Sequence, residues 1–255
     1  MIASQRFEMI KQMVDEKGIV NTKELARLMN VTETTIRRDC EELEKQGKLI
    51  RVHGGAKSVS QKAIVSNQDE KDVRNRTEHD ADKSKVCKKA AFFVKEGDCI
   101  FLDGGTTVVP MLHFLRDKKI KIVTHSLLVA EAFRDLDMKA ELFLIGGRYI
   151  KEYNMSVGPV ALSELSRFNF DHAFLGCAGM DLEKEIVYTT EVETMMVKEQ
   201  AMAQSVKKYL LLDSSKLSVR GFYSFVNSRE FDAVICNRCG EAEEMETLPD
   251  NIILV

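Results

Sequence analysis

The sequence predicts two domains: an N-terminal all-α winged helix-turn-helix and a larger C-terminal α/β domain with a mainly parallel sheet. Three short helical patterns followed by the string KLIRVHGGA indicate the first domain. Seven short apolar runs, separated by helical patterns, indicate the second, because strands that alternate with helices form a parallel sheet covered on both faces. We place the first domain at residues 1–57, a polar linker at 58–82 and the second domain at 83–255.

The N-terminal helices follow from the spacing of apolar residues and from capping residues. Residues 4–17 carry apolar side chains at helical spacing. A second helix begins at about Thr22, its expected N-cap, and ends at Asn30. Thr32 is the expected cap of a third helix, which ends before Gly47, and KLIRVHGGA then predicts a β-hairpin or wing.

The third helix has one apolar face and one polar face. In a helix-turn-helix this helix enters the major groove, where arginine pairs with guanine or phosphate and threonine contacts phosphate or a thymine methyl group. Taken singly, each polar residue is also explained by a solvated amphipathic helix. Taken together with the wing, the pattern predicts double-stranded DNA as a partner, bound through Thr32, Thr34, Thr35, Arg37, Arg38, Arg51 and His53.

Charge and apolar content limit the possible functions. The 255 residues carry a net charge of −3, and residues 1–57 hold 11 Lys and Arg against 9 Asp and Glu. This asymmetry permits a DNA-binding domain without showing one. No apolar run approaches the ~20 residues that span a bilayer, and the N-terminus lacks the apolar stretch of a signal peptide. We therefore expect a cytoplasmic protein, with no membrane contact and reduced cysteines.

Small and polar residues follow several of the predicted strands, in the strings DGGTT, THS, GGR, GCAG and DSSK. In an open α/β sheet, ligands bind at the carboxyl ends of the strands. These strand ends therefore converge, and they predict a small-molecule site in the second domain.

The string TTIRRDCEELEKQGKLIRVHGGA resembles the DeoR family of bacterial sugar-metabolism regulators, as do Arg6 and Ile10 before it. The resemblance continues across residues 83–216, in DGGTT, VTHS, LIGGR, VGP, FDHAFLG and DSSK. It implies that residues 32–38 read operator DNA, with Asp39 in a structural role. It also implies a second domain that resembles ribose-5-phosphate isomerase in fold and binds a sugar phosphate or related metabolite.

Each of the matching pieces has a physical reading. Glycines in the turn at 103–107 let the backbone approach a ligand, and amide groups at a helix N-terminus favour an anion. Lys83 and Lys216 can supply positive charge. Lys198 could reach the site from its helical stretch, but it is expected to be solvated. The expected effector-binding residues are Lys83, Asp103, Gly104, Gly105, Thr106, Thr107, Thr124, Ser126, Gly146, Gly147, Arg148, Asp213 and Lys216.

The sequence departs from the family pattern at a few positions. Cys40 stands where a larger aliphatic residue is usual, and it should pack in the same place. His125 stands where the family often has Asn, and Glu185 where Gly is common. Both lie near expected ligand loops, so the effector need not be a common sugar phosphate. The string ICNRC also departs from the usual Thr-Asp ending of its strand.

No metal, cofactor or catalytic site is expected. Cys236 and Cys239 form a CxxC pair, but a structural zinc needs four ligands and no second pair follows. The histidines lack metal spacing, and there is no Walker loop or nucleophile elbow.

The predicted function is a DNA-binding transcriptional regulator: a repressor of a carbohydrate-catabolism operon, controlled by a phosphorylated metabolite. A two-fold operator implies a homo-dimer or homo-tetramer. One alternative is a sugar-phosphate isomerase-like enzyme with an accessory DNA-binding domain, for which Asp103, Asp181 or Glu191 would be the base. Another is a DNA-binding protein without a ligand, which would leave the glycine-rich strand ends unexplained.

Overall fold

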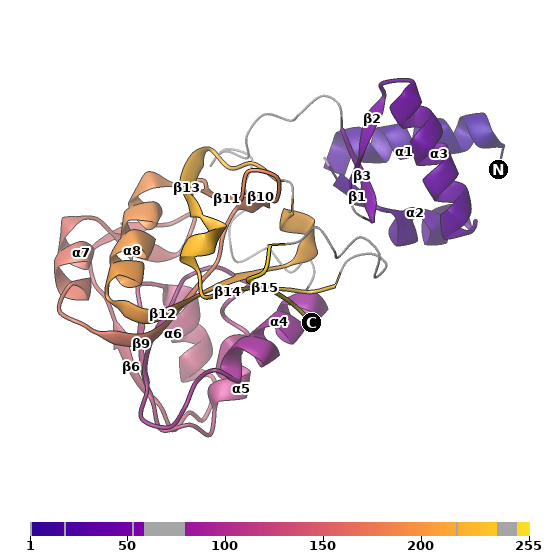
Figure 1. Ribbon diagram of the computed structural model, residues 1–255. Helices are drawn as coiled ribbons and strands as arrows, with labels where there is room; N and C mark the ends of the chain where they lie inside the picture. The colour runs from indigo at the N-terminus through magenta and orange to yellow at the C-terminus, as the bar shows by residue number, and fades with distance from the viewer. Residues whose placement is uncertain (1, 18, 53, 59–79, 218, 239–248) are drawn as a thin grey trace. The chain divides into compact units, whose positions relative to one another are not determined.

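The computed structural model describes residues 2–17, 19–52, 54–58, 80–217, 219–238 and 249–255. These residues form two compact units, one from residues 2–58 and one from residues 80–238 and 249–255 (Figure 1). Each unit has an apolar core of its own. No helix within these ranges is long and apolar enough to cross a membrane.

The smaller unit combines three helices with a three-stranded antiparallel sheet in the order β1-β3-β2. Ile10, Leu25 and Ile36, one from each helix, are fully buried in its core. The three predicted helices and the predicted hairpin are confirmed, as α1 (Ala3–Lys17), α2 (Thr22–Met29), α3 (Glu33–Lys45), β2 (Leu49–Val52) and β3 (Gly55–Ser58).

One strand of the smaller unit, β1 (Ile19–Asn21), was not expected from the sequence. It is too short for an alternating pattern, and its pairing with β3 is long-range. Gly55 permits this pairing, because a Cβ at that position would lie 2.0 Å from the carbonyl oxygen of Val20.

The start of α2 differs from the expectation that Thr22 is its N-cap. Asn21 is the cap, with its side chain accepting a hydrogen bond from the Lys23 amide at 2.7 Å. Thr22 is the first helical residue, and its hydroxyl donates to the Gly54 carbonyl at 3.0 Å. The other two caps are as expected: Asn30 ends α2 with φ 51°, and Thr32 begins α3.

The larger unit is built on a seven-stranded sheet in the order β15-β14-β12-β9-β4-β5-β6. Every neighbouring pair in it is parallel. All seven strands expected from apolar runs are confirmed: β4 (Cys99–Leu102), β5 (Lys121–Thr124), β6 (Glu141–Leu144), β9 (Phe170–Leu175), β12 (Ser205–Leu212), β14 (Ala233–Cys236) and β15 (Ile252–Leu254).

Helices cover both faces of this sheet (Figure 1). Side chains alternate along a strand, so Ile100 and Leu102 of β4 pack on one side and Phe101 on the other. The first side is covered by α4 (Asp80–Ala91), α5 (Met111–Leu115) and α6 (Leu127–Arg134), and the second by α7 (Pro159–Leu165) and α8 (Val192–Ala203). The first residues of α4 fall within the expected linker, most of which lies outside the described residues.

The strand order reverses between β4 and β9. From β4 the chain proceeds outward to β5 and β6, then returns to β9 beside β4 and proceeds outward in the other direction. At such a switch point the loops after the two central strands diverge and leave room for a ligand. Asp103 follows β4 and Gly176 follows β9, so both lie there.

The larger unit also contains short antiparallel strands outside the seven-stranded sheet. They were not expected from the sequence, because none is long enough to show a periodic pattern. They are β7 (Arg148–Ile150) with β8 (Met155–Val157), and β10 (Gly179–Asp181) with β11 (Ile186–Thr189) and β13 (Tyr223–Asn227). Glu185 lies in the turn between β10 and β11 with φ 56°. A left-handed backbone favours glycine. The residue that stands where the family commonly has Gly is therefore in the turn of a hairpin.

Candidate functional sites

The third helix of the smaller unit presents the polar face that the sequence predicted. Thr34, Arg37 and Arg38 are exposed, and Ile36 and Cys40 are buried on the opposite face. Cys40 thus packs in the core, as expected for that departure. The hydroxyls of Thr32 and Thr35 lie 2.9 Å apart and the Thr35 amide donates to Thr32, so this pair also shapes the helix start.

An ion pair fixes this helix against α1. Arg6 donates from Nε and Nη2 to the two carboxylate oxygens of Asp39, at 2.6 and 3.0 Å. The two side chains are only 13% and 8% exposed, so the pair is largely shielded from solvent. The expected structural role of Asp39 is confirmed, and Arg6 is its partner.

The wing is tied to the same helix through Arg51. Its backbone amide and its Nε donate to the two carboxylate oxygens of Glu44, at 2.9 and 2.7 Å. These hydrogen bonds lower the pKa of Glu44. Arg51 is about half exposed, so its guanidinium also faces solvent. His53, the other predicted wing residue, lies outside the described residues.

Asp103 is the centre of the polar network at the switch point of the larger unit. It is fully buried, and its Oδ1 accepts from the Gly104 amide at 2.8 Å and faces His125 Nε2 at 3.3 Å. Its Oδ2 accepts from the Gly176 amide at 2.9 Å and from Lys198 Nζ. A carboxylate has about four lone-pair sites, and a protein group lies at each of those of Asp103, with His125 donating when its proton is on Nε2.

The charge of Asp103 is strongly favoured despite its burial. Desolvation raises the pKa of this carboxyl, but the charge of Lys198 and the hydrogen bonds from His125 and Lys198 outweigh it, and the pKa lies well below the ordinary range. Asp103 therefore stays ionised and holds β4, β9 and α8 together.

Lys198 is not solvated, contrary to the expectation from the sequence. It is 6% exposed, and its Nζ donates to Asp103 and to the Gly176 carbonyl at 2.7 Å. Its neighbours on the buried face of α8 are Thr194, Val197, Ala201 and Met202, at helical spacing. That spacing was the available signal, because it places Lys198 within the apolar stripe of the helix.

His125 is fully buried in the same network. Its Nδ1 lies 2.9 Å from the Ser156 carbonyl and its Nε2 3.3 Å from Asp103. Both partners are acceptors, and a neutral imidazole can donate to only one of them. His125, which stands where the family often has Asn, thus lies in the polar network beneath the turn at 103–107. There it links the end of β5 to β8 and to the end of β4.

A second group of polar residues surrounds Thr107. Lys216 Nζ lies 3.2 Å from Thr107 Oγ1 and 2.8 Å from the Cys177 carbonyl. Asp213 is buried and caps the short turn that carries Lys216. Lys83 is 4% exposed, and desolvation lowers its pKa, with Asp213 raising it and Lys216 lowering it further. Lys83 also forms an ion pair with the carboxylate of Asp80, its Nζ lying 3.7 Å from Oδ1, so two ammonium groups and two carboxylates interact here.

The turn at 103–107 offers unpaired amide groups beside these lysines. Within the described part of the chain, the amides of Gly105, Thr106 and Thr107 donate to no other residue. Cys87 holds the turn from beneath by donating its thiol to the Thr107 carbonyl at 2.8 Å, and burial raises the pKa of that thiol to about 12. Free N–H groups at a glycine-containing turn form an anion-binding concavity.

The remaining predicted effector residues have structural partners. Thr124 donates its hydroxyl to the Leu102 carbonyl at 2.7 Å, and Ser126 caps α6. The Gly146 amide donates to Glu164, and Arg148 forms an exposed ion pair with Glu193. Gly147 has φ +143°, and a Cβ there would lie 2.6 Å from the Val157 carbonyl oxygen. Their contact with an effector stays a prediction.

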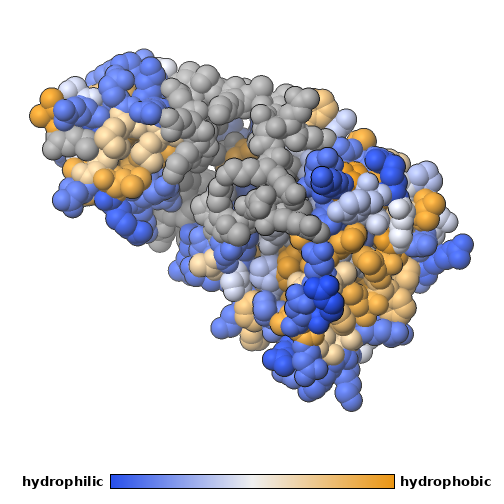
Figure 2. All heavy atoms as spheres, turned by 180° about the vertical axis from the view of Figure 1, so that it is seen from behind, coloured by the Kyte–Doolittle hydropathy of each residue, from blue (hydrophilic) through white to orange (hydrophobic). Residues whose placement is uncertain are grey.

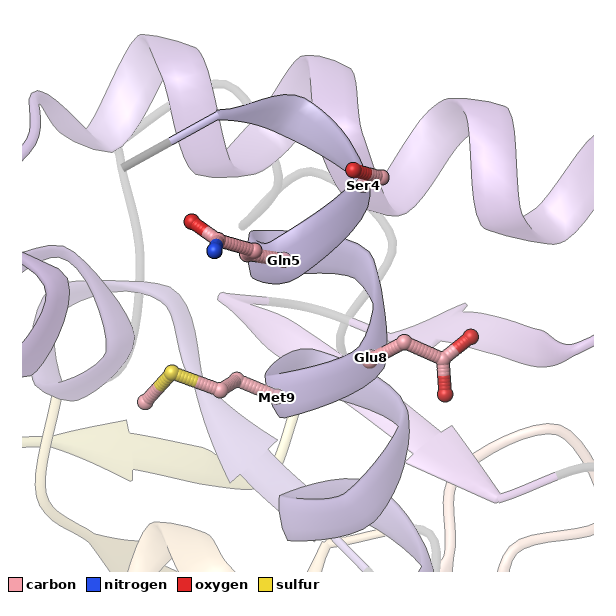
Figure 3. Close-up of a pocket in the computed structure, with 4 residues that line it drawn as sticks. All are labelled: Ser4, Gln5, Glu8 and Met9. Atoms are coloured by element: carbon pink, nitrogen blue, oxygen red, sulfur yellow. The ribbon is translucent and has the colours of Figure 1, made fainter.

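Two other features of the chain do not form a site. Ser4, Gln5, Glu8 and Met9, all from α1, line a surface hollow, and in Figure 3 Gln5 and Met9 point to one side of the helix and Ser4 and Glu8 to the other. A single exposed helix supplies this lining, so the hollow lacks converging polar groups. Among the described residues, no three His, Cys, Asp or Glu side chains are grouped as metal ligands would be. Five free cysteines are described, four of them buried, and Cys239 lies outside the described residues.

Comparison with known proteins matches both units to one family. The model of the DeoR-like helix-turn-helix domain matches residues 6–62, and that of the DeoR C terminal sensor domain matches residues 78–238. An uncharacterized HTH-type transcriptional regulator, FruR, of Bacillus subtilis (strain 168) is 33% identical over 226 residues, covering 88% of this chain and 87% of that protein. A lactose phosphotransferase system repressor of Staphylococcus aureus (strain NCTC 8325 / PS 47) is 30% identical over 254 residues, covering 98% of each.

Solved structures show weaker similarity. A probable sor operon regulator from Shigella flexneri has 11% identity and a TM-score of 0.42, covering 82% of this chain and 97% of that chain. A ribose 5-phosphate isomerase from Plasmodium falciparum has 18% identity and a TM-score of 0.39, covering 55% of this chain and 54% of that one. These similarities are low, and the family assignment rests on the sequence matches.

Proposed function

The chain belongs to the DeoR family of transcriptional regulators, and from this premise we propose that it represses a carbohydrate-catabolism operon and responds to a phosphorylated sugar. The helix-turn-helix implies DNA as one partner, and the sensor domain implies a metabolite as the other. A relative that is a lactose phosphotransferase system repressor supports the sugar assignment. A regulator of bacterial operators would act in the cytoplasm.

For DNA contact we propose the exposed face of α3 and the wing. Arg37 and Arg38 would reach base edges or phosphate, and Thr34 lies on the same face. Thr32 and Thr35 would contact phosphate from the helix start, and Arg51 and His53 would contact the backbone from the wing. Two heads on a two-fold operator would span half-sites about 34–36 Å apart, which requires at least a dimer.

For the effector we propose a phosphate site at the turn 103–107. The observation that carries it is the set of three unpaired amides, of Gly105, Thr106 and Thr107, beside the ammonium groups of Lys83 and Lys216. A dianion there would accept hydrogen bonds from the amides and relieve the repulsion between the two lysines. Asp213 would hold Lys216 in place or accept from a sugar hydroxyl.

Asp103 would act on the effector indirectly. Its oxygens are filled by donors of the chain, so we expect it to position the turn through Gly104 rather than to touch the ligand. Gly104 packs against Met155, and a Cβ there would lie 2.3 Å from Met155 Cε. The turn therefore has little freedom to shift, and its amides are preorganised.

The DeoR family is a family of regulators, and the chain is not an enzyme. The three carboxylates considered as a catalytic base each have a structural role. Asp103 is saturated with donors, Asp181 accepts from the Glu183 and Lys184 amides, and Glu191 caps α8. None is poised to accept a proton from a substrate.

The test is binding to DNA from upstream of the protein's own gene, measured by fluorescence anisotropy at fixed salt with a panel of phosphorylated sugars and their unphosphorylated counterparts. Fixed salt is needed because phosphate contacts make the affinity fall steeply with ionic strength. We expect nanomolar binding that one phosphorylated compound weakens. Lys216→Met should keep the DNA affinity and lose the response.

A matched control is Lys139→Met, which removes an exposed lysine of the sensor domain that pairs with Asp117. It should respond as the wild type does. If Lys216→Met also responds as the wild type does, the proposed phosphate site is wrong. If the wild type binds DNA weakly and without sequence preference, the proposed function itself is wrong.

A further inference from the structure

The helix α6 and the strand β6 form an apolar area on the surface of the sensor domain. Neither element includes the turn at 103–107. Figure 2 shows apolar residues gathered on this side of the domain, with hydrophilic residues crossing the area. Monomeric proteins rarely expose a contiguous apolar patch of this kind, and such patches mark interaction surfaces. We call this surface, from Leu127–Arg134 and Glu141–Leu144, the α6–β6 face.

The composition of α6 does not fit a helix that faces solvent. Only Glu131 and Arg134 of its eight residues, LLVAEAFR, are polar. Val129 is the one residue of α6 that is fully buried, whereas Leu127, Leu128 and Phe133 keep part of their surface. A helix that is apolar around most of its circumference is normally covered on more than one side.

The neighbouring strand β6 is the edge of the seven-stranded sheet. It pairs with β5 on one side only. Leu142 and Leu144 lie on the same side of the strand as α6, and Leu144 is 47% exposed. The strand ELFL contains no lysine or proline, which are the common means of protecting an edge from pairing.

We propose that the α6–β6 face is covered by a second copy of this chain, packed about a two-fold axis. This inference rests on the proposed function, which needs two DNA-binding heads. A two-fold contact must be self-complementary: if one residue contacts a second residue of the other copy, the same contact is repeated with the two copies exchanged. An edge strand satisfies this by antiparallel pairing with its symmetry mate.

The charges on α6 are also self-complementary. Glu131 and Arg134 are one turn apart and have opposite charge. When two copies of α6 cross antiparallel at this turn, Glu131 faces the partner subunit's Arg134, and Arg134 faces the partner subunit's Glu131. Among the described residues, Arg134 forms an ion pair with the adjacent Asp135, and the charge of Glu131 on the same helix also acts on it. Arg134 and Asp135 are highly exposed, so their ion pair is a weak interaction in water.

The first experiment is charge reversal, with sedimentation equilibrium of the full chain at low salt. Glu131→Arg and Arg134→Glu each place like charges across the axis twice, and we expect each to weaken association at least about tenfold. The double variant Glu131→Arg with Arg134→Glu restores opposite charges, so it should associate about as tightly as the wild type. Thermal melts of all variants would show that the fold is kept.

The second experiment tests the apolar part of the face. Leu144→Ser should weaken association, because it removes exposed apolar surface that the contact buries. Val206→Ser is the matched control, since Val206 is 74% exposed on β12 and lies outside the α6–β6 face. It should leave association unchanged.

The outcomes separate this inference from the proposed function. If the wild type associates and binds a two-fold operator but no α6–β6 variant changes its association, the proposed surface is wrong and the function stands. The same holds if the double charge swap associates no better than the single variants. If the wild type is monomeric at every concentration and on DNA, the two-fold mode of DNA binding is wrong as well.

Discussion

At the scale of single residues, the sensor domain depends on one fully buried carboxylate. Asp103→Asn would keep the shape of the side chain but leave Lys198 without its counter-ion. Breaking one side of a buried pair costs about 3–5 kcal/mol, and we expect a loss of that size in urea unfolding followed by circular dichroism. Asp103→Asn with Lys198→Met should regain part of it, because no uncompensated charge remains.

The pH dependence of the folding stability follows from the direction of the Asp103 pKa shift. The pKa of Asp103 is lower in the folded chain, so its stabilising contribution is full above the pKa of an unfolded aspartate, about 3.9. The contribution is lost as the pH falls toward the lower, folded value. A wild type and an Asp103→Asn variant that unfold at the same urea concentration at pH 7 would contradict this role.

Lys83 predicts how effector binding depends on pH. Burial lowers the pKa of its ammonium group, so it loses its proton at a lower pH than an ordinary lysine. A phosphomonoester is a dianion throughout the range above its second pKa of about 6. Effector affinity should therefore be highest near neutral pH and fall as the pH rises through the lowered pKa of Lys83, by up to about tenfold per pH unit.

Calorimetry between pH 7 and 10 would measure this dependence, using the phosphorylated sugar found in the DNA-binding assay. Lys83→Arg is the informative variant, because arginine stays charged over the whole range. Its affinity should vary little with pH. Equal pH dependence in the variant and the wild type would show that Lys83 does not face the bound anion.

At the scale of elements, the wing is held by the ion pair between Arg51 and Glu44, and DNA would compete for the same guanidinium. We expect Arg51→Ala to weaken binding to all sequences alike and to reduce the salt slope by about 0.9, the value for one phosphate contact. Glu44→Gln should strengthen binding, because Arg51 is then free of its carboxylate. Anisotropy titrations at several salt concentrations measure both, and unchanged binding in Arg51→Ala would remove the wing from the interface.

The hairpin of β10 and β11 shows how one element accommodates an unfavourable residue. Glu185 has a left-handed backbone, and its carboxylate accepts two hydrogen bonds from Arg229, at 2.5 and 2.9 Å. Glu185→Ala keeps the strained backbone without the ion pair, whereas Glu185→Gly relieves the strain. We expect the alanine variant to have the lowest melting temperature of the three proteins, and an alanine variant as stable as the glycine variant would argue against strain.

At the scale of the whole molecule, regulation requires that effector and DNA binding be linked. If the effector lowers operator affinity by some factor, operator DNA must lower effector affinity by the same factor. Typical couplings of ~1–3 kcal/mol correspond to ~5–150-fold. Titrating effector into protein with and without operator DNA should give this ratio, and an effector affinity that operator DNA leaves unchanged would mean that the two binding events are not linked.

Much of the fold could be predicted from the sequence, because its signals are local. Seven apolar runs became seven parallel strands. The cap at Thr32 followed from a hydroxyl that accepts from the Thr35 amide, and the end of α2 at Asn30 from a residue that adopts the left-handed backbone. The short strands β1, β7, β8, β10, β11 and β13 could not be predicted. Each is only three to five residues long, too short for a periodic pattern. β1 and β13 form by pairing with strands far along the chain, whereas β7 with β8 and β10 with β11 are local hairpins.

The candidate site was also predictable only in part. The sequence by itself determined which side chains lie at the switch point, since strands that end in DGGTT and DSSK bring those residues to one edge of the sheet. Only the tertiary structure decided their roles. It buried Lys198 against Asp103, filled the oxygens of Asp103 with donors and left the amides of Gly105, Thr106 and Thr107 unpaired. The physical reason is that residue type sets what a group can donate or accept, whereas most of its partners come from distant chain segments: His125, Gly176 and Lys198 lie 22, 73 and 95 residues from Asp103.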